Sequence, residues 1–263
     1  MLKGLYTAYT GMLNEQHRMD VTANNLANAT TNGYKKEGAT AQAFDDVLAY
    51  KIKDMSEGYG LTKREGIMNP GVKIGEGYTD FSEGSFKTTD KPLDLALAGK
   101  GFFAVQHKDS EGNTSTMYTR DGNFTLDAGG YLVTQDGDYV LDRNNSRIQC
   151  DPLRDITINE AGQIYQSAGG TGNRLVTTLQ VADFEDYNYL EHYGENFYVP
   201  VEGANRIDST AKVESGFLEG SNISVVTEMV NMIAIQRQYE ANQKVITTYD
   251  SSLEIAANQL GKL

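Results

Sequence analysis

Residues 221–263 read SNISVVTEMVNMIAIQRQYEANQKVITTYDSSLEIAANQLGKL, and neither Gly nor Pro occurs between Ser221 and Leu260. Apolar residues recur here at every seventh position: Val225, Met232, Tyr239, Ile246, Leu253 and Leu260. With the positions three residues further on, ten of twelve seam positions are apolar, Glu228 and Asn242 being the exceptions. This repeat predicts a helix, roughly 60 Å long, that packs along other helices.

The other end of the chain carries a second seam with the same three-four spacing. Its members are Leu2, Leu5, Tyr9, Met12, Met19, Ala23 and Leu26, with Gln16 as the one break. Gly4 and Gly11 are also seven residues apart and would let another backbone approach closely. We therefore expect the first helix to pair with the last. The alternative is that both helices pack as ordinary helices on one globular core.

Between these ends, the sequence is typical of β structure. From about Phe81 the hydrophobic period shifts to two, and turn signals occur at Asp121-Gly122, Ala128-Gly129-Gly130 and Asp136-Gly137. The predicted fold class is α+β: long N- and C-terminal helices form a coiled-coil-like domain with an inserted, mainly antiparallel β domain. The expected domains are residues 1–32 with 221–263 (helical), 33–80 (connector) and 81–220 (β).

The connector is predicted to be extended and irregular, because 56–77 is rich in Gly and carries Pro70. Within it, the spacing of Phe44, Val47, Leu48 and Ile52 favours a short helix over Ala41–Asp54.

Charge is distributed unevenly along the chain. The protein has 263 residues and a formal net charge of -13, yet residues 1–32 sum to zero and 221–263 to -1. Near-neutral ends can pack against copies of themselves, whereas the acidic middle argues against nucleic acid and anionic membrane partners. No window approaches the length of a membrane span, and the N-terminus lacks an uninterrupted apolar region, so we expect a soluble protein without membrane insertion or a cleaved Sec signal.

A search for catalytic and metal-binding patterns favours none. Cys150 is the only cysteine and is expected to be a small buried apolar residue, and His17, His107 and His192 show no ligand spacing. Gly99-Lys100-Gly101 lacks the Ser/Thr and the helix of a phosphate loop. A calcium loop at 136–144 would lack its central Gly and terminal Glu. We therefore predict no cofactor, no metal and no enzymatic activity.

Three groups of residues resemble one known family. Asn24-Asn25-Leu26-Ala27-Asn28, followed by Thr31, Gly33, Tyr34 and Lys35, is similar to the N-terminal signature of bacterial flagellar axial proteins, the rod and hook group. Internal motifs of the longer members resemble Gly99–Phe103 and Tyr118–Phe124. The C-terminal segment of the family resembles Leu218–Ile223 and Met232–Asn242. By length the chain resembles the distal-rod protein or its similarly sized proximal-rod relative, and both remain open.

The resemblance implies a structural subunit of the flagellar basal-body rod, the drive shaft between motor and hook. It implies polymerisation through the terminal helices, so the seam is expected to include the residues Leu5, Met12, Met19, Leu26, Val225, Met232, Tyr239, Ile246, Leu253 and Leu260. The implied partners are copies of this chain, other rod and hook proteins, and the flagellar type III export apparatus, which would deliver the chain to an extracytoplasmic basal body.

Two other classes of function are compatible with these patterns. One is a soluble, coiled-coil-anchored β module that binds a protein or glycan ligand. The other is an enzyme such as a wall hydrolase fused to a rod-like domain, which would need a pair of carboxylates that spacing alone does not reveal.

Overall fold

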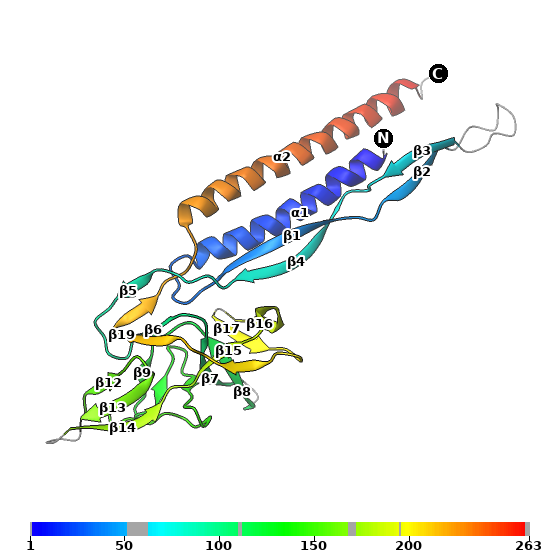
Figure 1. Ribbon diagram of the computed structural model, residues 1–263. Helices are drawn as coiled ribbons and strands as arrows, with labels where there is room; N and C mark the ends of the chain where they lie inside the picture. The colour runs from blue at the N-terminus through cyan, green and yellow to red at the C-terminus, as the bar shows by residue number, and fades with distance from the viewer. Residues whose placement is uncertain (1, 52–62, 110–111, 168–171, 195, 261–263) are drawn as a thin grey trace. The chain divides into compact units, whose positions relative to one another are not determined.

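The computed structural model describes residues 2–51, 63–109, 112–167, 172–194 and 196–260 (Figure 1). Contacts within the chain define two compact units. One unit, here the helical unit, comprises residues up to 27, 37–80 and those from 224 on; the other, the β unit, comprises 28–36 and 81–223.

Two long helices dominate the helical unit. Helix α1 spans Leu2–Ala27 and helix α2 spans Val225–Ile255, with a π-helical turn, η3, over Ala256–Leu260. The two helices pack against each other and run side by side in Figure 1, blue beside orange and red. The pairing of the first helix with the last, around an inserted antiparallel β region, is thereby confirmed.

The row of residues that α1 buries differs from the row of large apolar residues predicted for it. Small and polar residues recur along the helix as buried or half-buried positions at three- and four-residue intervals: Gly4, Ala8, Gly11, Glu15, Arg18, Thr22 and Asn25. Two members of the seam predicted for this helix, Tyr9 and Ala23, are exposed. The glycines permit close packing, because a Cβ at Gly11 would lie 3.1 Å from Asn242 Nδ2 and one at Gly4 would lie 2.9 Å from Tyr249 Cζ.

Paired strands replace most of the predicted connector. Strand β1 (Lys36–Ala43) pairs with β4 (Val72–Asp80), which also contacts α1, and β2 (Val47–Lys51) forms an antiparallel pair with β3 (Lys63–Met68). The short helix predicted over Ala41–Asp54 is therefore wrong as far as Lys51, and residues 52–54 lie outside the described part. Four apolar residues over nine positions did not distinguish a helix from strands that pair with distant segments.

The β unit is built around one nine-stranded sheet whose registered pairs are all antiparallel. Its strands are β7 (Phe102–Lys108), β8 (Thr114–Thr119), β9 (Thr125–Leu126), β10 (Leu132–Val133), β11 (Tyr139–Val140), β15 (Val181–Phe184), β16 (Leu190–Tyr193), β17 (Phe197–Pro200) and β18 (Arg206–Asp208). A short 3-10 turn, η2 (Tyr187–Tyr189), precedes β16.

Three smaller sheets complete the β unit. Strands β12 (Ile156–Ile158), β13 (Gln163–Ser167) and β14 (Asn173–Thr178) form one. Strand β6 (Leu95–Ala98) pairs with β19 (Lys212–Ser215), and β5 (Phe86–Thr88) pairs with β20 (Phe217–Glu219). The last two pairs join the first strands of the unit to the last ones, so its beginning and end lie together.

Side chains of β7 enter two different cores because successive residues of a strand point to opposite faces. Phe103 and Val105 belong to an aliphatic core, whereas Phe102 and Ala104 belong to an aromatic one with Tyr198. Cys150 lies in the aliphatic core, 5% exposed, as predicted, and burial raises the pKa of its thiol.

Candidate functional site

Asn25 of the N-terminal signature connects α1 to the first strand of its own unit. Its amide Nδ2 donates to the Glu37 carbonyl at 2.7 Å, and its Oδ1 accepts from the Glu37 backbone N–H at 3.0 Å. Asn25 is 1% exposed, so these two bonds are shielded from water. A side chain that pairs with a backbone amide in both directions requires Asn or Gln at this position.

The rest of the signature has mixed roles. Thr31 Oγ1 donates to Asn28 Oδ1 at 3.1 Å, which shapes the turn after α1. Asn24 and Ala27 are exposed, and Leu26 is half-buried. Tyr34 is buried in the β unit, where its ring meets the edge of His192 with centroids 6.2 Å apart.

Gly33 is required by a close approach of two backbones. Its φ is +70°, and its N–H donates to the Glu219 carbonyl at 2.8 Å. A Cβ at this position would lie 2.6 Å from the carbonyl carbon of Arg120. Gly33 thus brings together the N-terminal signature, the internal motif around Arg120 and the C-terminal motif around Glu219.

A buried ionic cluster lies at this meeting point, formed by Lys35, Arg120 and Glu219. Lys35 Nζ lies 2.5 Å from Glu219 Oε1, and Arg120 Nη1 donates to Glu219 Oε2 at 3.2 Å. The three residues are 1–2% exposed. Each of the three motifs that carry the family resemblance therefore contributes one charged residue to a single contact.

Backbone groups supply much of the remaining hydrogen bonding of the ionic cluster. Lys35 Nζ also donates to the Ser82 carbonyl at 2.7 Å, Arg120 Nη2 donates to the Gly99 carbonyl at 2.8 Å, and the Gly84 N–H donates to Glu219 Oε1 at 3.0 Å. The Arg120 guanidinium lies over the Phe102 ring, 5.4 Å from its centroid.

Two cations around one carboxylate leave the ionic cluster with a net positive charge in a desolvated place. Burial lowers the pKa of Lys35, and the neighbouring Glu219 carboxylate opposes that shift. Removing one partner of a buried pair leaves an uncompensated charge, which is far costlier than losing an exposed pair. The arrangement is suited to holding the two ends of the β unit together, and it offers no nucleophile and base pair for catalysis.

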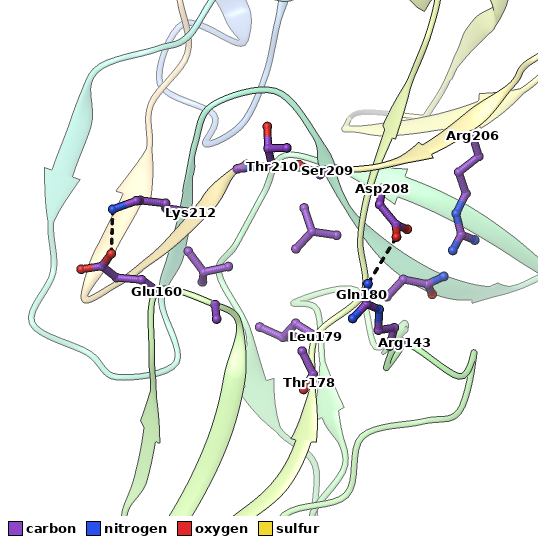
Figure 2. Close-up of a pocket in the computed structure, with 14 residues that line it drawn as sticks. Arg143, Glu160, Thr178, Leu179, Gln180, Arg206, Asp208, Ser209, Thr210 and Lys212 are labelled. Carbon is purple, nitrogen blue, oxygen red and sulfur yellow. Dashed lines mark hydrogen bonds and ion pairs between the residues drawn. The ribbon is translucent and has the colours of Figure 1, made fainter.

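A cavity of about 370 Å³ is formed elsewhere in the β unit (Figure 2). Its charged side chains are largely paired with one another: Arg143 Nη2 lies 3.3 Å from Asp208 Oδ2, and Lys212 Nζ lies 2.9 Å from Glu160 Oε2, both drawn as dashed lines. Both pairs are exposed, so they are weak and screened by salt. Nothing in this geometry resembles a catalytic set.

A second cavity, of about 340 Å³, is acidic and is lined by residues including Asp121, Asp136, Asp138 and His107. His107 Nδ1 lies 2.9 Å from Asp138 Oδ1. Burial raises the pKa of Asp121 to about 6; the Asn123 backbone N–H opposes the shift, and Asp136 and Asp94 add to it. Across the described segments, no three His, Cys, Asp or Glu side chains are grouped as a metal site would require.

The ten seam residues remain partly accessible wherever their side chains are described. Leu5, Met12, Met19 and Leu26 on α1, and Met232, Tyr239 and Ile246 on α2, are half-buried. Val225 and Leu253 are 41% and 38% exposed, and the side chain of Leu260 lies outside the described part. The polymerisation role of these residues stays a prediction.

Neither Arg120 nor Glu219 stood out as a site residue in the sequence. Both lie inside the motifs that resemble the family, and that resemblance was the only signal for them in the sequence. No helix among the described residues is both long enough and apolar enough to cross a membrane.

Comparison with known families gives three matches along the chain. The flagella basal body rod protein family matches residues 5–35, the flagellar hook protein FlgE/F/G D1 domain matches 96–166, and the flagellar basal body rod FlgEFG protein C-terminal family matches 214–260.

Curated relatives are similar over almost the whole chain. The flagellar basal-body rod protein FlgG of Agrobacterium fabrum is 34% identical over 98% of this chain and 100% of its own length. FlgG of Bacillus subtilis is 32% identical over 98% and 99%. The flagellar hook-basal body complex protein FlhO of Bacillus subtilis is also 32% identical, over 100% of both chains.

Proposed function

Because the chain belongs to the FlgE/F/G family of flagellar basal-body rod and hook proteins, we propose that it is a rod subunit that polymerises helically through its terminal helices. It is a structural protein of the basal-body rod and not an enzyme. The family does not specify which surfaces of this chain meet the neighbouring subunits, and those surfaces are the subject of the proposal.

The observation that carries the proposal is the pairing of α1 with α2. Both helices come from the near-neutral ends of an acidic chain, and both keep large apolar side chains exposed after they have paired. Exposed apolar side chains gathered on one element mark an interaction surface. A contact between unlike surfaces of identical subunits builds a helical polymer when the rotation between neighbours does not close a ring.

Within this proposal the ionic cluster has a structural task. It ties the segment after α1 to the segment before α2 inside the β unit, since Lys35 and Glu219 lie near those two junctions. A rod subunit transmits torque, and a buried, hydrogen-bonded contact between the entry and exit of a domain keeps both junctions together under load.

The other proposed partners follow from family membership. They are further rod and hook proteins and the flagellar export apparatus, through which the chain would reach the rod. Cys150 is the only cysteine of the chain, so no intrachain disulfide is possible.

The direct test is to delete the gene and examine purified basal bodies by negative-stain electron microscopy. We expect a rod that stops short and cells that do not swim, both restored by the wild-type chain. The length of the truncated rod then gives the position of this subunit, distal or proximal. Complete rods in motile deletion cells would contradict the proposal.

A further inference from the structure

The register of the two helices follows from their glycines. Gly4 lies beside Tyr249 and Gly11 beside Asn242, so seven residues up α1 correspond to seven residues down α2. The helices are therefore antiparallel. Continuing the register places Arg18 level with Ile235, one of the two buried residues of α2.

Each helix carries a second apolar group outside the in-chain contact. On α1 it consists of Tyr6, Tyr9 and Leu13, which are 50%, 48% and 41% exposed; we call it the α1 stripe. On α2 it consists of Val226, Met229, Val230 and Ile233, which are 51–72% exposed; we call it the α2 stripe.

Both stripes lie on the outer sides of the helix pair. With about 3.5 residues per turn, each stripe is turned more than a quarter turn from the line that contacts the partner helix. The pair therefore presents two unlike apolar surfaces, one on the outer side of α1 and one on the outer side of α2.

The two stripes are also displaced along the helices. By the register above, the α1 stripe lies level with residues 240–247 of α2, whereas the α2 stripe occupies 226–233. Their centres are separated by about 14 residues, or about 21 Å at about 1.5 Å per residue. Two copies that join stripe to stripe cannot sit level with each other.

We propose that the α1 stripe of one copy packs on the α2 stripe of the next copy, with the copies displaced by about 21 Å along the helix axis. The inference rests on the proposed function and names the surfaces it uses. The occupant is a second copy, because the stripes are apolar on both sides, lie on opposite edges of one unit, and come from segments whose net charges are 0 and -1 in a chain of -13. Unlike surfaces joined with an axial displacement generate a helix and not a ring.

Cysteine crosslinking in assembled rods tests this contact. Cells would express the full chain with Tyr9→Cys and Val230→Cys in place of the native chain, because the proposed displacement brings these two positions level, and isolated basal bodies would be treated with a short thiol crosslinker. We expect a ladder of dimers, trimers and higher species. Within one chain the two positions are about 21 Å apart along the axis, on opposite outer sides, so an internal link does not form. Wild-type protein should give no ladder, since its one thiol is buried.

A matched pair of positions tests the displacement. Lys244 lies on the same side of α2 as Val230 but two heptads further on, level with Tyr9 of the same copy, so Tyr9→Cys with Lys244→Cys should give no ladder. A ladder from this second pair would mean that the copies sit level, and dimers from Val230→Cys alone would mean a symmetric α2 contact. Either result overturns the inference.

Opposite charges introduced on the two stripes test the same contact if a cysteine variant does not assemble. Tyr9→Lys and Val230→Glu should each block incorporation, and the double variant should recover it at least about tenfold over either single variant, as expected of an ion pair desolvated at the contact. Normal rods from both single variants would overturn the stripe contact and leave the proposed function intact. A complete rod in the deletion strain would instead refute the proposed function itself.

Discussion

Lys35 Nζ lies 2.5 Å from Glu219 Oε1 although 184 residues separate the two along the chain. Both side chains are fully buried, and Arg120 approaches the other oxygen of the same carboxylate. The contact makes three distant motifs depend on one another.

Glu219→Gln should lower the free energy of unfolding of the β unit by about 3–5 kcal/mol, because two buried cations would lose their carboxylate. Urea denaturation followed by circular dichroism measures the change. Glu160→Gln is the matched control, since it removes a direct ion pair with Lys212, 2.9 Å long, that is exposed, and we expect no measurable change. If both substitutions change the free energy of unfolding equally, the burial of the Lys35–Glu219 pair does not add to stability.

Asp121→Asn should stabilise the chain near neutral pH. The pKa of Asp121 is about 6 in the folded protein and 3.8 in the unfolded chain, mainly because of burial. Below about pH 4 Asp121 is protonated in both states and does not oppose folding. Between about pH 4 and 6 it ionises in the unfolded chain first, which lowers the free energy of unfolding. Asn does not ionise, so the free energy of unfolding of Asp121→Asn should exceed that of the wild-type chain by an amount that grows between about pH 4 and 6. The difference should reach at most about 3 kcal/mol and stay constant at higher pH.

Unfolding of both proteins across about pH 4–8 tests this dependence. Asp127→Asn, a substitution at an exposed turn, separates the local effect from the general relief of an acidic chain that loses one negative charge. The explanation fails if Asp127→Asn shows the same pH profile, or if the advantage of Asp121→Asn persists undiminished at the acidic end of the range.

Gly33→Ala should destabilise the β unit by about 2–4 kcal/mol. The left-handed conformation at φ +70° costs about 1–2 kcal/mol for a residue with a Cβ, and the crowding against Arg120 adds to it. Gly194→Ala is a close control because its φ is +68° and, among the described residues, a Cβ there would meet no atom within 4 Å. Thermal unfolding measures the loss of stability in both variants. The loss in Gly33→Ala minus the loss in Gly194→Ala gives the free-energy cost of crowding a Cβ against Arg120.

How much of this fold the sequence predicts depends on how local each signal is. The seven-residue repeat of α2 is local, and Met232, Ile235, Tyr239 and Ile246 do line its inner side. On the inner side of α1 the spacing of Gly4 and Gly11 did indicate a close approach of another backbone. The polar members Glu15, Thr22 and Asn25 were missed, because a search for apolar residues passes over them. The seam residues of α1 are instead half-buried beside this line.

The ionic cluster shows the complementary limit. Lys35, Arg120 and Glu219 each stand in a recognisable motif, but pairing them requires knowing that three segments meet, and no local pattern encodes that. The same reason explains why the helix predicted over Ala41–Asp54 is wrong as far as Lys51: the backbone of β1 and β2 is satisfied by strands that lie further along the chain.

Ile246→Asp should prevent incorporation into the rod while leaving the β unit folded. Ile246 is half-buried on the inner side of α2, so the change removes part of the roughly 1.5–3 kcal/mol that full burial would contribute, and it places a charge at the contact with α1. The β unit has its own cores, and Ile246 belongs to neither. Swimming assays and basal-body imaging measure incorporation, and urea denaturation of the purified chain measures the β unit. Thr248→Asp adds the same charge at an exposed position of the same helix and should swim normally. If Ile246→Asp cells swim as well as Thr248→Asp cells, the pairing of α1 with α2 is not needed for assembly.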